Sequence, residues 1–293
     1  MTAVAAQSRD LGFSMGAVPL LRDLIHERTG LYYDAGRLEN LADRVAPLVV
    51  ERGFASFLDY YYLLKYDADA GGEWARVMDA LAVPETYFWR EPDQLRAIVD
   101  VVVPALARQQ TAAPIRIWSV PCSTGEEPLT LAMMLQDAGW FDRAAIEIHA
   151  SDASPAAIAR ARAGKYRERS FRSLPVHLRQ RYFTQDQDGW IVDPTIHARV
   201  TSWSVVNVLC EGDVAARARV PIIFCRNLFI YFSEAGVRQV VEQFARLMPC
   251  PAYLCVAAAE SLLRVTTAFE LEEIGGAFVY VKTAQACKKE TDA

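Results

Sequence analysis

Apolar side chains recur at helical spacing through the first quarter of the chain. Between residues 18 and 80 they return every three or four positions, as on one face of a helix. Gly30, Gly53 and Gly71-Gly72 interrupt the pattern where helices can end. The apolar stripes consist of Leu20, Leu21, Leu24 and Ile25, then Leu38, Leu41, Val45 and Leu48, then Phe54, Phe57, Tyr60, Tyr61 and Leu64. This pattern predicts a small all-helical domain, which we place at residues 1–84.

From residue 115 onward, short apolar runs alternate with amphipathic segments. Such alternation predicts an α/β fold with a mostly parallel sheet covered on both faces. Gly275-Gly276 joins residues 269–274 to 277–282 as a hairpin, which makes one edge antiparallel. A mixed edge is typical of S-adenosylmethionine (SAM)-dependent methyltransferases and atypical of NAD-binding domains. The predicted strands are 115–120, 146–151, 221–225, 252–257 and 278–281, and the predicted helices are 129–138, 155–163 and 234–246.

The interval between the second and third predicted strands is too long for a single helix. The turn Asp186-Gln187-Asp188-Gly189 is flanked by Tyr182-Phe183 and Trp190-Ile191-Val192, and Ala198-Arg199-Val200 follows. Apolar runs on both sides of such a turn predict a hairpin. We therefore expect a small antiparallel β-subdomain at residues 170–205, inserted into the α/β domain that we place at residues 85–293.

Composition excludes several classes of protein. A chain of 293 residues with 52% hydrophobic content can bury a sizeable core, and its net charge of −5 argues against a dedicated nucleic-acid binder. No apolar run reaches 18 residues, so we expect no direct membrane insertion, and the N-terminus lacks the layout of a secretion signal. The six cysteines form no C-x-x-C pair, so we interpret several as buried thiols in a reducing cytoplasm and expect no metal site.

The most informative segment is residues 115–128, which predicts a buried strand, a tight turn and a helix. The first turn of that helix carries Glu126 and Glu127. Carboxylates suit a ligand with a cation and hydroxyls, whereas a phosphate cradle presents bare backbone N–H groups and usually a lysine or extra glycines. SAM is the common cofactor of the first kind. Alternatively, Ser123 and Glu126 form a capping box, and Glu126 then serves only the helix.

Polar residues also follow other predicted strands. Asp152 closes one, where a carboxylate can accept hydrogen bonds from ribose hydroxyls; alternatively it caps the helix that begins near Pro155. Asn227 and Tyr231 follow the strand that ends at residue 225, at the edge where ligands gather; alternatively they are a turn residue and a core tyrosine. Arg90 lies at the junction of the two domains, where it either holds a substrate carboxylate or pairs with a neighbouring acid.

Together these segments resemble the CheR-type chemotaxis receptor methyltransferases, which use SAM to esterify glutamate side chains of methyl-accepting receptors. Residues 85–91, 122–128, 150–152 and 224–232 are similar to the family signatures E-T-x-F-F-R-E, C-S-T-G-E-E-P, A-S/T-D and F-C-R-N-x-x-I-Y-F. Tyr166-Arg167, Leu174-Pro175 and Glu260-Ser261-Leu262 resemble further family segments. The similarity covers residues 20–282, nearly the whole chain.

The resemblance implies a SAM-dependent protein-glutamate O-methyltransferase with S-adenosylhomocysteine as product. Asp152 would bind the ribose and Glu126 the methionine end of SAM, while Arg90 and Tyr231 would face the incoming glutamate as catalytic residues. The implied partner is the cytoplasmic domain of a methyl-accepting chemotaxis-type receptor, and we expect a monomer. By motif match, the residues that contact SAM are Thr86, Arg90, Glu126, Asp152, Asn207, Val208, Asn227 and Leu228.

The chain departs from the family pattern in two ways. Pro84 stands where many members have Asn, which removes one side-chain hydrogen bond to the cofactor. Residues 1–90 carry nine Lys/Arg against thirteen Asp/Glu, a net of −4, whereas the receptor-contacting N-terminal helix of the family is basic. A basic stretch at residues 160–181, opposed only by Glu168, is either a solvated face or a surface for an acidic partner. The alternative functions are a methyltransferase for another acceptor and a SAM-sensing module without catalysis, for which Pro84 is the one supporting feature.

Overall fold

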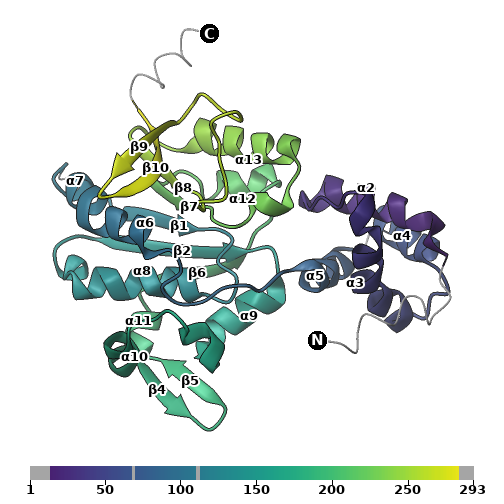
Figure 1. Ribbon diagram of the computed structural model, residues 1–293, viewed down its shortest axis with the longest axis horizontal. Coiled ribbons are helices and arrows are strands. Elements are labelled where there is room, and N and C mark those ends of the chain that lie inside the picture. Colours follow the sequence, from purple (N-terminus) through teal and green to yellow (C-terminus); the bar gives the residue numbers. More distant parts are fainter. Residues whose placement is uncertain (1–13, 68–69, 110–112, 284–293) are drawn as a thin grey trace.

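The computed structural model describes residues 14–67, 70–109 and 113–283, so residues 1–13 of the predicted helical domain lie outside the described part. A bundle of helices lies beside a larger α/β domain (Figure 1). Within the described ranges, no helix combines the length and the apolar character needed to cross a bilayer.

The N-terminal domain is the predicted all-helical bundle. It contains α2 (Val18–Thr29), α3 (Leu38–Glu51), α4 (Phe57–Tyr66) and α5 (Gly71–Leu81), with 3₁₀ turns η1 (Met15–Ala17) and η2 (Ala35–Arg37). The predicted stripes form its core, in which Leu21, Ile25, Leu41, Val45 and Phe57 are buried. Helix α2 ends at Gly30, where φ is +78° and a Cβ atom would overlap the ring of Phe232. Glycine therefore permits both the helix end and the close contact with the α/β domain.

A buried carboxylate connects three helices of this bundle. Glu73 of α5 is 1% exposed and accepts hydrogen bonds from the Tyr60 hydroxyl (2.7 Å) and from Arg52 Nε (2.7 Å), while Arg76 Nη1 lies 3.3 Å from Glu73 Oε2. Burial raises the pKa of this carboxyl, but the hydrogen bonds from Arg52 and Tyr60 and the nearby charges outweigh it. The pKa of Glu73 therefore lies below its ordinary value.

We expect Glu73→Ala to lower the free energy of unfolding by about 1–3 kcal/mol, because the buried Tyr60 hydroxyl loses its acceptor. Urea unfolding of the full chain measures this. The matched control is Glu51→Ala, whose carboxylate pairs with Arg76 at the surface and should change stability by less than about 0.5 kcal/mol. Because the folded pKa of Glu73 is lowered, its contribution is present above about pH 4.3 and is lost as the pH falls through the folded pKa. This account would be contradicted if the difference in the free energy of unfolding between wild type and Glu73→Ala became larger as the pH was lowered.

The α/β domain is built on a seven-stranded sheet with strand order β6-β2-β1-β7-β8-β10-β9. The first five strands in this order are parallel, and β10 runs antiparallel to both β8 and β9. This arrangement confirms the predicted fold class, including the antiparallel C-terminal hairpin. The strands are β1 (Ile115–Ser119), β2 (Ile146–Asp152), β6 (Val200–Val205), β7 (Ile222–Phe224), β8 (Ala252–Cys255), β9 (Glu270–Ile274) and β10 (Ala277–Lys282).

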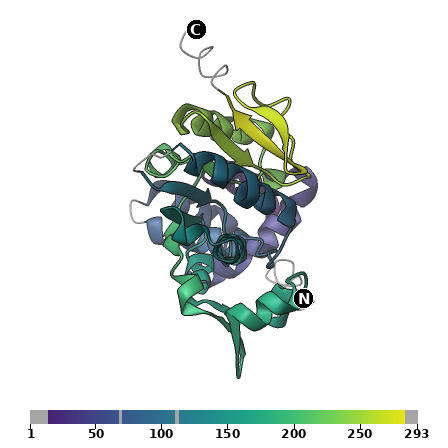
Figure 2. The ribbon, with the colours of Figure 1, turned by 90° about the vertical axis from the view of Figure 1, so that its left-hand side faces the viewer.

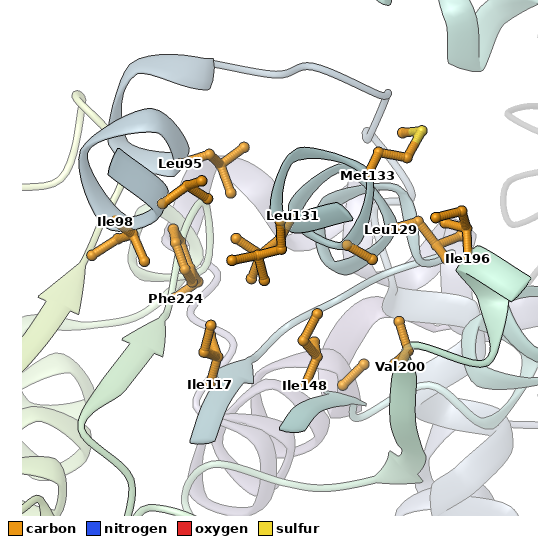
Figure 3. Close-up of a cluster of buried hydrophobic side chains, with 14 of the residues drawn as sticks. Leu95, Ile98, Ile117, Leu129, Leu131, Met133, Ile148, Ile196, Val200 and Phe224 are labelled. Carbon is orange, nitrogen blue, oxygen red and sulfur yellow. The ribbon is translucent and has the colours of Figure 1, made fainter. Parts of the chain in front are cut away.

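Successive residues of the central strands face opposite layers of helices. Ile117, Ile148 and Phe224 point into the cluster shown in Figure 3, whereas Trp118 and Ile223 belong to the cluster on the other face. Both faces are therefore buried, as the continuous apolar runs predicted. The first face is covered by α6 (Pro92–Ala97), the π-helical turn η3 (Ile98–Val102), α7 (Val103–Ala107), α8 (Glu126–Asp137) and α9 (Pro155–Ala163), and the second by α12 (Glu211–Ala215) and α13 (Glu234–Leu247).

A second, three-stranded antiparallel sheet projects from the α/β domain (Figure 2). It contains β3 (Lys165–Tyr166), β4 (Phe183–Asp186) and β5 (Gly189–Val192), with η5 (Glu168–Phe171), α10 (Val176–Tyr182) and α11 (Pro194–His197) around it. We call residues 165–197 the inserted subdomain. The predicted boundaries of 170–205 were wrong at both ends, because this sheet begins at Lys165 and residues 200–205 form β6 of the main sheet. As an edge strand with alternating polar residues, β6 has the pattern of a hairpin strand.

Candidate active site

A cavity of about 440 Å³ lies at the carboxyl ends of the central strands, where the N-terminal domain faces the sheet. The chain runs outward from β1 to β2 on one side and from β7 to β8 on the other, so the strand order reverses between β1 and β7, and such a switch point is where open α/β sheets bind ligands. The volume falls within the roughly 300–1,000 Å³ of small-molecule sites. Six of the predicted site residues line the cavity: Thr86, Arg90, Asp152, Asn227, Leu228 and Tyr231.

The loop between β1 and α8 forms one wall of this cavity. Ser123 and Gly125 have positive φ angles of 49° and 98°, and a Cβ atom on Gly125 would lie 3.0 Å from the side chains of Tyr166 and Trp203. The tight turn therefore needs glycine at this position. Gly125 itself is the N-cap of α8, without a side-chain capping bond, so the alternative of a Ser123–Glu126 capping box is wrong.

Asp152 connects this loop to the end of β2. Its Oδ2 accepts a hydrogen bond from the Ser123 backbone N–H, and its Oδ1 accepts one from the Ser154 N–H, both at 2.9 Å. Burial raises the pKa of the Asp152 carboxyl, and these N–H groups oppose that rise. Ser154, not Asp152, caps α9, since its Oγ accepts from the Ala157 N–H. The alternative of Asp152 as a helix cap is therefore wrong.

The two adjacent glutamates of α8 point to different surroundings. The Glu126 carboxylate accepts hydrogen bonds from the hydroxyls of Thr124 (2.6 Å) and Ser170 (3.0 Å), and Glu126 is absent from the cavity wall. Glu127 lines the cavity and accepts from the Ser119 hydroxyl at 2.8 Å. Consecutive helical residues point about 100° apart, which places the two carboxylates in these different surroundings. The predicted contact of Glu126 with SAM stays a prediction, while Glu127 is the member of the pair that lines the cavity.

Arg226 is the main charged residue that sequence reasoning missed. Its side chain is 2% exposed and lines the cavity. Nη1 donates to Glu127 (3.1 Å), and Nη2 donates to the Arg90 carbonyl (3.0 Å) and to the Glu91 carboxylate (3.2 Å). Burial raises the pKa of the Glu127 carboxyl, although the charge of Arg226 opposes it. Arg226 therefore ties the segment around Arg90 to helix α8.

The loop that carries Asn227 and Tyr231 is held by a second buried carboxylate. Glu260 accepts hydrogen bonds from the backbone N–H groups of Asn227 (2.9 Å), Phe229 (2.7 Å) and Ala257 (2.8 Å). Asn227 has a φ of +59°, which Asn tolerates better than most residues. This scaffold explains why an E-S-L segment far along the chain accompanies the strand-end motif.

Besides Glu126, two further predicted residues are absent from the cavity wall. The Asn207 side chain donates to the Arg28 carbonyl (2.7 Å) and accepts from the Leu209 N–H (3.0 Å), and Val208 is buried in the apolar core beside α13. Neither lines the cavity. Their predicted contact with SAM stays a prediction, while the structure gives Asn207 a role in docking the N-terminal domain.

The N-terminal domain closes the cavity from the opposite side. Asp79 of α5 accepts hydrogen bonds from the Ser154 hydroxyl (2.5 Å) and the Ala156 N–H (3.0 Å). After α2, the Tyr32 N–H donates to the Tyr231 carbonyl at 2.8 Å. Sequence reasoning placed Pro84 and Thr86 near the cofactor but not the helical domain itself. Its contributions to the cavity wall include Tyr33, Asn40, Arg44, Met78 and Asp79.

The residues of the wall fit SAM. The carboxylates of Asp152 and Glu127 and the amide of Asn227 can face the cations and hydroxyls of a sulfonium nucleoside. No lysine lies among the described residues that line the cavity, and the loop of Gly125 presents a single glycine. Five arginines also line the cavity, so the fit to SAM rests on the carboxylates and the amide named above and not on an absence of cationic side chains.

Comparisons with known proteins show the family to which the chain is similar. Residues 84–277 match the family model described as CheR methyltransferase, SAM binding domain, and residues 18–82 match CheR methyltransferase, all-alpha domain. Chemotaxis protein methyltransferase 2 of Vibrio cholerae is 31% identical over 89% of this chain and 91% of its own length. The chemotaxis protein methyltransferase of Klebsiella aerogenes is 29% identical over 92% of this chain and 91% of its own length. Probable biofilm formation methyltransferase WspC of Pseudomonas putida is 32% identical over 88% of this chain, which spans 60% of that relative.

Proposed function

The chain belongs to the CheR methyltransferase family and is a SAM-dependent methyltransferase, and we propose that it esterifies glutamate side chains in the cytoplasmic domain of a chemotaxis-type receptor. Relatives of similar length are named chemotaxis protein methyltransferases, which supports this acceptor and a place in the cytoplasm. The observation that carries the proposal is that Arg90 and Tyr231 line the same cavity as Asp152 and Asn227.

Within this proposal, the cavity residues divide between cofactor and acceptor. Asp152 accepts hydrogen bonds from the ribose hydroxyls, and Asn227-Leu228 flank the adenine. Glu127, rather than the predicted Glu126, faces the ammonium of the methionine end, because Glu127 lies in the wall. Glu126 instead fixes the loop and the inserted subdomain through Thr124 and Ser170.

The reaction needs alignment rather than a general base. A glutamate carboxyl has an ordinary pKa of about 4.3, so the acceptor is already an anionic nucleophile at neutral pH. When bound, SAM supplies the methyl group, so that an O–CH₃ bond forms as the S–CH₃ bond breaks and leaves a neutral thioether. Arg90 Nη1 donates to the Glu85 carbonyl and its Nε lies 4.0 Å from the Glu91 carboxylate, so we assign the remaining donors on Nη2 to the acceptor carboxylate. Proximity and alignment can contribute roughly 7–11 kcal/mol to such a step.

The decisive experiment is methyl transfer from labelled SAM to purified receptor cytoplasmic fragments. We expect label on the receptor that alkali releases as methanol, because esters hydrolyse in base and N-methyl groups do not. Since relatives of nearly equal identity are named for chemotaxis and for biofilm formation, fragments from both kinds of pathway should be offered.

The alternative functions give different outcomes in the same experiment. Alkali-stable label would identify a methyltransferase of another acceptor. Calorimetric binding of SAM without transfer to any fragment would identify the SAM-sensing module that Pro84 suggested. Either outcome would contradict the proposed function.

A further inference from the structure

The segment that carries Arg90 is fastened to the inserted subdomain. The Phe88 N–H donates to the Ser170 carbonyl at 2.8 Å, and the Phe88 ring packs edge-on against Tyr166 and Phe183, with centroids 4.7 and 4.9 Å apart. Phe88 is fully buried. The inserted subdomain therefore packs against the middle of the segment 85–91 through Phe88.

One side chain of the subdomain reaches further along this segment. Arg172 lies directly after η5, and its Nη2 donates to the Glu85 carboxylate at 2.5 Å. Its guanidinium also lies over the Tyr87 ring, 3.7 Å from the ring centroid. A planar guanidinium that both pairs with a carboxylate and stacks on a ring is held in one orientation, which an ammonium could not reproduce.

Arg90 contacts the same two residues from the other direction. Its Nη1 donates to the Glu85 carbonyl at 2.5 Å, and its guanidinium lies 5.6 Å from the centroid of the Tyr87 ring. Glu85 thus offers its carboxylate to Arg172 and its carbonyl to Arg90, while Tyr87 contacts both guanidinium groups. Arg90 lines the cavity and Arg172 does not.

We propose that Arg172 is a positioning residue for Arg90, which it orients through Glu85 and Tyr87. The inserted subdomain then contributes to the geometry of the site as well as to the surface of the molecule. This inference rests on the proposed function insofar as Arg90 holds the acceptor carboxylate, but the contacts themselves do not depend on the acceptor.

A surface ion pair alone would not carry this role. Arg172 and Glu85 are 43% and 61% exposed, and isolated exposed pairs contribute little. The effect comes from the combination of the pair with the stacked ring, which restricts where the Glu85 carbonyl can lie. Because Phe88 stays buried without Arg172, removing this side chain should leave the protein folded and free Arg90 to move.

The test is a double-mutant cycle with Arg172→Ala and Arg90→Ala, measured as kcat for methyl transfer and as Kd for SAM. We expect Arg172→Ala to lower kcat by about tenfold, since small misplacements of reacting groups are costly, and to raise Kd modestly. In the Arg90→Ala background, Arg172→Ala should change either quantity by less than about twofold, because the two residues act through one network. Arg167→Ala removes an equal exposed charge from the same subdomain and should leave kcat unchanged.

Conservative variants separate positioning from general disruption. Tyr87→Phe keeps the ring and should retain most of kcat, whereas Arg172→Lys keeps the charge but not the planar stack and should lie between Arg172→Ala and wild type. Additive effects in both readouts, or an equal loss in Arg167→Ala, would overturn the positioning role. The wild type could transfer no methyl group while the double-mutant cycle, measured as Kd for SAM, still shows coupling between Arg90 and Arg172. In that case the proposed function fails and the positioning role stands.

Discussion

Asp152→Ala is expected to weaken SAM binding by about a hundredfold or more. Both carboxylate oxygens of Asp152 accept backbone N–H groups that shape the cavity, from Ser123 and from Ser154. Hydrogen bonds to a charged group contribute about 1.5–3 kcal/mol each, and tenfold in affinity corresponds to about 1.4 kcal/mol. Alanine removes these bonds together with the acceptors that we assign to the ribose. Isothermal calorimetry with SAM and S-adenosylhomocysteine measures the change.

Two further variants make this expectation specific. Asp152→Asn keeps one acceptor oxygen but loses the charge, so its affinity should fall between those of Asp152→Ala and wild type. Asp193→Ala removes an aspartate that accepts the Thr195 N–H at 2.7 Å at the start of α11, outside the cavity. It should bind SAM as the wild type does. Binding by Asp152→Ala within about threefold of wild type would refute the assignment of this carboxylate to the cofactor.

The fold follows from the sequence because its patterns are local. Helical spacing in residues 18–80 and strand alternation after residue 115 each depend on burial of one face or of both faces. The place of strand β6 in the main sheet was missed because its local pattern is ambiguous. An edge strand buries less apolar surface than a central strand and carries polar residues at alternate positions. Whether such a strand joins the main sheet or the insertion depends on a partner that lies fifty residues away, here β2.

The site residues that could be predicted from the sequence are those that follow a strand of the parallel sheet. Asp152, Asn227 and Tyr231 follow parallel strands, and parallel strands of one sheet bring their carboxyl ends to one edge. The choice between Glu126 and Glu127 depends on the rotation of α8 about its axis, which a motif does not record. The roles of Asp79 and Asn207 depend on how the two domains dock, and that contact leaves no periodic signal.

The position of Arg226 near the cavity could have been predicted from its neighbours in the sequence. Its ion-pair partners could not. It precedes Asn227 in the strand-end motif, so a place near the cavity is expected. Its contacts come from two distant segments, Glu91 before the sheet and Glu127 on α8. A buried arginine needs such partners, because an unpaired charge in the interior is strongly unfavourable. Only the tertiary structure shows that two carboxylates supply them.

Arg226→Met is therefore expected to lower the free energy of unfolding by about 3–5 kcal/mol, as found when one member of a buried ion pair is removed. The Glu127 side chain is only 16% exposed and would keep the Ser119 hydroxyl as its hydrogen-bond donor. The double variant Arg226→Met/Glu127→Gln removes both charges and should recover a large part of the loss. Arg246→Ala, which breaks an exposed pair with Glu211, should leave stability nearly unchanged.

The pH dependence of Arg226→Met distinguishes an uncompensated charge from a simple packing defect. Burial raises the pKa of Glu127, and loss of Arg226 should raise it further. A carboxyl whose folded pKa exceeds the unfolded value of about 4.3 favours the folded state when protonated, so stability falls as the pH rises from about 4.3 through the folded pKa. The deficit of Arg226→Met relative to wild type should thus be smaller near pH 5 than near pH 8. Urea unfolding at both pH values tests this, and a deficit independent of pH would mean that lost packing around the arginine stem, not the Glu127 charge, causes the instability.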